Sequence, residues 1–328
     1  MRRRAFMAVL GGVAAWPLVP RAQPASAMPL VGFLSSASPD LYAGILRAFR
    51  EGLSETGHVE GHNVAVEYRW AHGQNDQLPA LAADLVRREV SVIAAPGSTP
   101  AALAAKAATA TIPIVFQVGV DPIAAGLVAR LDRPGGNVTG ITNLNTELGL
   151  KRLEALRELV PTMKVLGLLV NPTSLFITES VSRDLRSAAR TLGLELHILH
   201  ASTERDFDTV FATLDGLRAG GLVIAPDVLF ISRSEQLAAL TVRHAVPAIA
   251  QYRDFVAAGG LMSYGGSFTE AAREVGIYTG RIIRGEKPAA LPVRQLTKVA
   301  LIINLKTVQA LGLTIPPSLL ARADEVIE

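Results

Sequence analysis

Polar side chains with binding chemistry gather where short runs of Val, Ile and Leu give way to loops. Ten residues are candidates for contact with a small ligand: Ser35, Ser36, Ser98, Thr99, Asp121, Asn171, Asp227, Tyr252, Arg253 and Tyr264. Hydroxyls and backbone amides suit a carboxylate, acidic side chains suit an ammonium group, and tyrosine rings provide an apolar surface with a polar tip. The set favours binding of a small zwitterion or carboxylate.

The run Ser98-Thr99-Pro100 is typical of a helix start, with a hydroxyl residue at the N-cap and proline at the first helical position. The free amides of that first turn, helped by the helix dipole, form a site for a carboxylate. A simple capping role for Ser98 or Thr99 is the alternative, and the two roles are compatible. Ser35 and Ser36 end the first apolar run, where strands of this kind line a cleft.

Charged and aromatic candidates each have two interpretations. Asp121 and Asp227 suit a ligand ammonium group, although Asp121 before proline also starts helices and Asp227 also fits a solvated loop. Arg253 suits a bidentate carboxylate contact or an ordinary exposed loop position. Tyr252 and Tyr264 suit stacking on a ligand or packing in the core.

Other site chemistries are poorly represented. The chain has no cysteine, and its six histidines form no H-E-x-x-H motif. The glycine-rich run at Arg133 lacks the spacing and the lysine of phosphate loops, and no G-x-S-x-G nucleophile turn is present. We therefore expect neither metal, cofactor nor catalysis.

The elements that must position these residues alternate between strand and helix. Expected strands are Pro29–Leu34, Asn63–Tyr68, Val90–Ala94, Ile114–Gln117, Val138–Ile141, Val165–Val170, Leu194–Leu199, Gly221–Ala225 and Ala248–Ala250. Expected helices are Leu41–Leu53, Gln77–Arg88, Pro100–Ala108, Leu148–Val160, Thr178–Leu192, Phe207–Leu217 and Ser234–His244. Continuous apolar strands indicate parallel sheets covered on both faces. A fresh series begins at Val165, so we predict an α/β fold of two doubly wound lobes with a ligand cleft between them.

The first 27 residues have the pattern of an export signal. Consecutive arginines precede an apolar run that is too short to span a bilayer, and Ala25-Ser26-Ala27 fits a signal peptidase site, so the mature chain is expected to start at Met28. Arg3-Arg4-x-Phe6-Met7 resembles a twin-arginine motif, and a Sec signal is the alternative. We expect an exported periplasmic protein without a membrane anchor.

Removal of this segment changes the charge balance. It carries four of the 32 basic residues and no acid, which leaves 28 basic against 29 acidic residues. No basic cluster remains, so nucleic acid is not an expected partner.

Several short motifs follow one another along the mature chain, namely Gly-Phe-Leu at 32–34, Leu78-Pro-Ala-Leu-Ala-Ala-Asp-Leu-Val, Gly97-Ser-Thr-Pro-Ala-Ala, Asp121-Pro, Arg133-Pro-Gly-Gly-Asn-Val-Thr-Gly, Gly259-Gly-Leu-Met-Ser-Tyr-Gly, Arg284-Gly-Glu-Lys-Pro and Ile303-Asn-Leu-Lys-Thr. Together they resemble the motifs of ABC transporter substrate-binding proteins, in the branch related to tryptophan- and tyrosine-binding proteins. The resemblance implies a type I periplasmic-binding fold, whose lobes close on a small solute and then dock on an inner-membrane permease.

It also implies three crossings between lobes, near residues 145, 262 and 292. Lobe 1 would comprise residues 28–145 and 263–291, and lobe 2 residues 146–262 and 292–328. We expect a monomer that binds an amino-acid-like or carboxylate-bearing solute. A sensory binding protein that reports to a membrane receptor is the first alternative, and an exported α/β hydrolase is the second.

Overall fold

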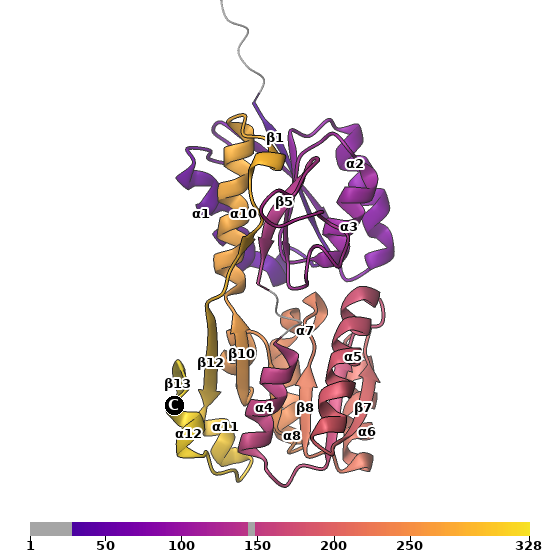
Figure 1. Cartoon of the computed structure of the whole chain (residues 1–328), viewed down its shortest axis with the longest axis vertical. Coiled ribbons are helices and arrows are strands. Elements are labelled where there is room, and N and C mark those ends of the chain that lie inside the picture. The colour runs from indigo at the N-terminus through magenta and orange to yellow at the C-terminus, as the bar shows by residue number, and fades with distance from the viewer. Residues whose placement is uncertain (1–27, 144–147) are drawn as a thin grey trace, which may run out of the picture.

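The computed structural model describes residues 28–143 and 148–328, which form two α/β lobes stacked along the long axis of the molecule (Figure 1). The expected export signal, residues 1–27, lies outside the described residues. In the described ranges, no helix combines the length and the apolar character needed to span a bilayer.

The first lobe contains a six-stranded parallel sheet in the order β11-β5-β4-β3-β1-β2. Its strands are β1 (Leu30–Ser35), β2 (Ala65–Trp70), β3 (Val92–Ala95), β4 (Ile114–Val118), β5 (Val138–Thr142) and β11 (Arg294–Gln295). Its helices are α1 (Ala43–Glu55), α2 (Leu78–Arg87), α3 (Thr99–Ala108) and α10 (Phe268–Ile283), with short 3-10 turns at Asp40–Tyr42, Asn75–Gln77 and Pro288–Ala290. Helices α1 and α10 cover one face of the sheet, and α2 and α3 cover the other (Figure 1).

The second lobe contains a seven-stranded sheet in the order β13-β12-β10-β9-β8-β6-β7, parallel except between β10 and β12. Its strands are β6 (Val165–Val170), β7 (Glu195–His200), β8 (Gly221–Ile224), β9 (Ala248–Ala250), β10 (Met262–Gly266), β12 (Val299–Asn304) and β13 (Glu325–Ile327). Its helices are α4 (Gly149–Leu159), α5 (Leu175–Thr191), α6 (Asp206–Leu217), α7 (Val228–Ser232), α8 (Ser234–Arg243), α9 (Arg253–Ala257), α11 (Leu305–Ala310) and α12 (Pro317–Leu320). The predicted fold class of two doubly wound α/β lobes is confirmed.

Strand pairing places two of the lobe boundaries later than expected. Residues 263–266 belong to β10, which lies between β9 and β12 in the second sheet, so the boundary expected at residue 262 is wrong by four residues. Arg294 and Gln295 pair with β5 of the first sheet, so the chain returns to the second lobe after residue 295 and not at 292. In both places backbone pairing extends beyond the apolar run that is visible in the sequence. The first crossing, expected near residue 145, involves residues 144–147, which lie outside the described residues.

Helix α10 follows the second crossing and packs closely against α1, the two helices lying side by side in Figure 1. A methyl group on Gly276 would lie 2.1 Å from the carbonyl oxygen of Phe49, and one on Gly52 would lie 1.8 Å from that of Arg273. Only glycine permits backbones to approach so closely. This contact fixes α10, and with it the residue that opens the helix, onto the first lobe.

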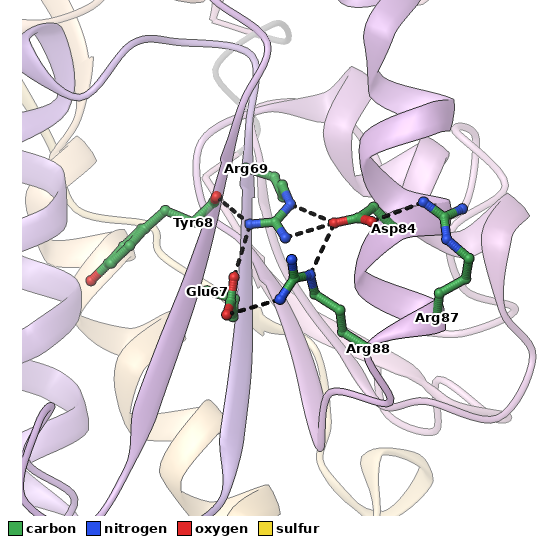
Figure 2. A network of polar contacts seen from close by, with 6 residues as sticks. All are labelled: Glu67, Tyr68, Arg69, Asp84, Arg87 and Arg88. Atoms are coloured by element: carbon green, nitrogen blue, oxygen red, sulfur yellow. Dashed lines mark hydrogen bonds and ion pairs between the residues drawn. The ribbon is translucent and has the colours of Figure 1, made fainter.

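Edge strand β2 is held to α2 by a cluster of ion pairs, which Figure 2 shows. Arg69 donates to Asp84 from Nε at 2.8 Å and from Nη2 at 2.6 Å, and its Nη1 donates to Glu67 at 3.0 Å. Arg87, the last residue of α2, and Arg88, its C-cap, donate to the same Asp84 carboxylate at 2.8 and 3.2 Å. The hydrogen bonds from Arg69 lower the pKa of the Asp84 carboxyl to about 2. The cluster therefore stabilises the strand whose end leads into the lobe junction.

The Asp84 carboxylate is expected to make this lobe sensitive to acid. Because its pKa is depressed in the folded state, it contributes stability above about pH 4 that is lost as pH falls toward about 2. Asp84→Asn should lower the midpoint of thermal unfolding at pH 7, and the difference from wild type should shrink between pH 4 and pH 2. Calorimetry across this range measures both, with Glu89→Gln as an exposed control outside the cluster. A pH-independent difference would contradict this role of the carboxylate.

Candidate ligand-binding site

A cavity of about 310 Å³ lies at the junction of the two lobes. From the first lobe its walls include Ser36, Ala37, Ser38, Leu41, His72, Gly73, Asn75, Gly97, Ser98, Thr99, Pro100, Gly119, Val120 and Phe268. From the second lobe they include Asn171, Ser174, Ile177, Pro226, Asp227, Val228, Leu229, Ile231, Ser232, Arg233, Gln251 and Tyr252. Most of these residues follow the carboxyl ends of parallel strands, which is where ligands bind in doubly wound folds.

The N-terminus of α3 forms the wall on the first lobe. Ser98 caps the helix by accepting a hydrogen bond from the Ala101 amide at 3.2 Å, and its Oγ lies 2.5 Å from Oγ of Ser36. Thr99 at the first helical position is only 4% exposed and lines the cavity beside this cap. The first-turn amides and clustered hydroxyls supply donors suited to a carboxylate.

Gly97 permits this turn to lie against the aromatic residues beside it. Its φ is +74°, and a methyl group there would lie 2.2 Å from Cζ of Phe268 and 2.5 Å from Oη of Tyr42. A larger residue would meet both backbone strain and a steric clash. Glycine at this position therefore brings the α3 N-terminus and the aromatic residues into one wall.

An aromatic contact joins the two lobes at the cavity. The ring of Tyr252, which follows β9 of the second lobe, lies 4.8 Å from the ring of Phe268, the first residue of α10. Phe268 also makes an edge contact with Tyr42, at a ring distance of 6.0 Å. Tyr252 and Phe268 both line the cavity, so an aromatic or aliphatic part of a ligand would meet an apolar surface there.

Asp227 lies in the wall of the second lobe with its carboxylate already occupied. Its Oδ1 accepts hydrogen bonds from Asn171 Nδ2 at 3.0 Å and from the Leu229 amide at 2.9 Å, and its Oδ2 accepts from Ser174 Oγ at 2.6 Å. Burial raises the pKa of Asp227, although these three donors oppose that rise. The arrangement caps α7 and anchors the polar groups around it.

Six of the ten candidate residues line the cavity, namely Ser36, Ser98, Thr99, Asn171, Asp227 and Tyr252. These residues were predicted because each follows an apolar run. In the structure, residues from both lobes that fit this pattern meet at one junction. Whether each contacts a ligand remains a prediction.

The other four candidates do not line the cavity, and each has a structural partner elsewhere. Ser35 is buried and accepts a hydrogen bond from the Ala37 amide at 3.1 Å, and Asp121 accepts from the Ile123 amide at 2.8 Å. Arg253 pairs with Glu325 of β13, donating from Nη2 to Oε1 at 2.6 Å. Tyr264 lies within β10, where its backbone pairs with β12 and its ring packs against the core.

Sequence reasoning missed several residues of the cavity wall. Asn75 lies in the turn that follows β2, and Gln251 lies between the end of β9 and Tyr252. Ser174 lies one turn beyond Asn171, and Phe268 reaches the cavity only because α10 returns to the first lobe. The strand-end rule could have found Asn75 and Gln251, whereas Phe268 depends on the lobe crossing.

Comparison with known proteins places this architecture in a family. Residues 33–327 match the sequence profile of the family described as ABC transporter substrate binding protein. A tyrosine-binding protein of Clostridioides difficile (strain R20291) is 27% identical over 269 residues, which cover 81% of this chain and 76% of that protein.

Two solved structures share the fold over 91% of this chain and 99% of their own. A conserved domain protein from Vibrio cholerae superposes with a TM-score of 0.82 at 26% identity. An ABC domain from Streptococcus pneumonia in complex with L-Trp superposes with a TM-score of 0.79 at 24% identity. The family resemblance seen in the sequence is confirmed by the match of residues 33–327. The chain therefore belongs to the ABC transporter substrate-binding protein family.

Proposed function

We propose that this chain is the exported solute-binding component of an ABC importer, which captures an aromatic amino acid or a related carboxylate by lobe closure and delivers it to an inner-membrane permease. The observation that carries the proposal is the cavity at the lobe junction. It combines the N-terminus of α3, which suits a carboxylate, with the Tyr252 and Phe268 rings, which suit an aromatic group.

The size of the cavity supports a single small solute. Its volume of about 310 Å³ lies near the lower end of the range of small-molecule sites, roughly 300–1,000 Å³. The names of two relatives, a tyrosine-binding protein and a domain in complex with L-Trp, agree with an aromatic amino acid. The pattern of residues 1–27 supports export to the periplasm by the twin-arginine or the Sec route.

Thermal unfolding of residues 28–328 with added solutes tests this function. A ligand that binds only the folded state, present at about 100 times its Kd, should raise the unfolding midpoint by roughly 4–5 °C. We expect such a shift with L-tyrosine or L-tryptophan and none with D-ribose. A shift with sugars alone would contradict the proposed ligand class.

Thr99→Val should weaken binding of a carboxylate ligand by about 1–3 kcal/mol, because a hydroxyl beside the α3 N-terminus is lost without a change in side-chain volume. Isothermal titration calorimetry with the amino acid that binds wild type measures the loss. Thr99→Ser should restore most of the affinity, and Thr213→Val on the exposed surface of α6 should change nothing. Unchanged affinity in Thr99→Val would remove this hydroxyl from the site.

A further inference from the structure

A chain of hydrogen bonds runs from Asp227 across the lobe junction to Asn75. Asn171 Nδ2 donates to Asp227 Oδ1 at 3.0 Å, and Thr173 Oγ1 donates to Asn171 Oδ1 at 2.8 Å. Asn75 Nδ2, from the first lobe, donates to Thr173 Oγ1 at 3.1 Å. The chain thus links the turn that follows β2 to the wall of the second lobe.

The donor and the acceptor of each hydrogen bond in this chain can be assigned. The Thr173 backbone N–H, which can only donate, also bonds to Asn171 Oδ1 at 3.0 Å, so the amide of Asn171 has one orientation. The single hydroxyl proton of Thr173 is then used on Asn171, and its oxygen must accept from Asn75. The amino group of Asn75 is thereby committed to Thr173, which leaves Oδ1 as the free end of its side chain.

Two buried carbonyl oxygens on the cavity residues lack a partner within the described ranges. They are Oδ1 of Asn75, on the first lobe, and Oε1 of Gln251, on the second. Gln251 is only 4% exposed. A buried acceptor without a donor is unfavourable, and buried polar groups in folded proteins nearly always have a partner. Both residues line the cavity, so a ligand that binds there is the candidate source of the missing N–H or O–H donors.

We infer that Asn75 and Gln251 determine specificity by accepting hydrogen bonds from the ligand, and that Asp227, Asn171 and Thr173 position Asn75 for this role. The inference rests on the proposed function and adds the ligand chemistry that the site selects. The ligand must carry donors as well as a carboxylate. The ammonium group of an amino acid supplies three N–H donors, and tyrosine or tryptophan adds an O–H or an indole N–H.

Asp227 is the obvious alternative as the ammonium acceptor, but three of the about four acceptor positions of its carboxylate are already used. Both of its oxygens already accept hydrogen bonds, from Asn171, Ser174 and the Leu229 amide. A neutral amide oxygen without a partner, such as that of Asn75, is the more available acceptor.

Calorimetry with matched ligand pairs tests the inference on residues 28–328. The pairs are L-tryptophan with 3-indolepropionate and L-tyrosine with 3-(4-hydroxyphenyl)propionate, which differ only in the amino group. Wild type should prefer each amino acid by about tenfold or more, the effect of a hydrogen bond to a charged group. Gln251→Met, which removes the acceptor, should reduce this preference to less than about threefold.

Substitution of Thr173 tests the positioning of Asn75 most specifically, because Thr173 does not line the cavity itself. Thr173→Val breaks the chain and frees the Asn75 amide to rotate, so the preference for the amino acid should fall as in Gln251→Met. Thr173→Ser keeps the hydroxyl and should keep the preference. A structural defect alone would weaken both members of each ligand pair equally.

The possible results separate this inference from the proposed function. If wild type binds each amino acid and its analogue equally, or if the variants weaken both in proportion, the inference is overturned and the cavity remains a solute site. If none of the four compounds binds wild type, the proposed ligand class is overturned together with the inference.

Discussion

Both sheets of this protein direct the carboxyl ends of their parallel strands toward the junction between the lobes, and the binding site depends on this arrangement. Loops after β1, β3 and β4 approach the cavity from one side, and loops after β6, β8 and β9 approach from the other. Each strand end brings a polar residue or a helix N-terminus to the same small volume. The later crossing at residues 266–268 adds Phe268 to the first lobe without moving β10 out of the second sheet.

Contacts across the junction explain how a ligand could favour lobe closure. The Tyr252–Phe268 ring contact and the Asn75–Thr173 hydrogen bond both join groups on different lobes. Each contact would be lost if the lobes separated, so both contacts stabilise only the closed state. A ligand shifts the equilibrium only by the contacts that it makes in one state and not in the other. Donors that reach the buried oxygens of Asn75 and Gln251 would be contacts of this kind.

The sequence predicts the fold well because continuous apolar strands and amphipathic helices are local patterns. Six of the ten site candidates reach the cavity for the same reason, since each follows an apolar run. The exceptions depend on distant parts of the chain. Arg253 pairs with Glu325, which lies 72 residues later in the chain. Tyr264 belongs to β10, and the apolar pattern of the sequence does not reveal that β10 pairs with β12. The role of Asn75 emerges only from a hydrogen bond to Thr173 across the lobes.

Small-angle X-ray scattering of residues 28–328, with and without L-tyrosine or L-tryptophan, tests the central claim most directly. If a solute binds between the lobes and draws them together, the radius of gyration should fall on saturation with the amino acid that binds. Binding confirmed by calorimetry with an unchanged radius of gyration would contradict capture by lobe closure.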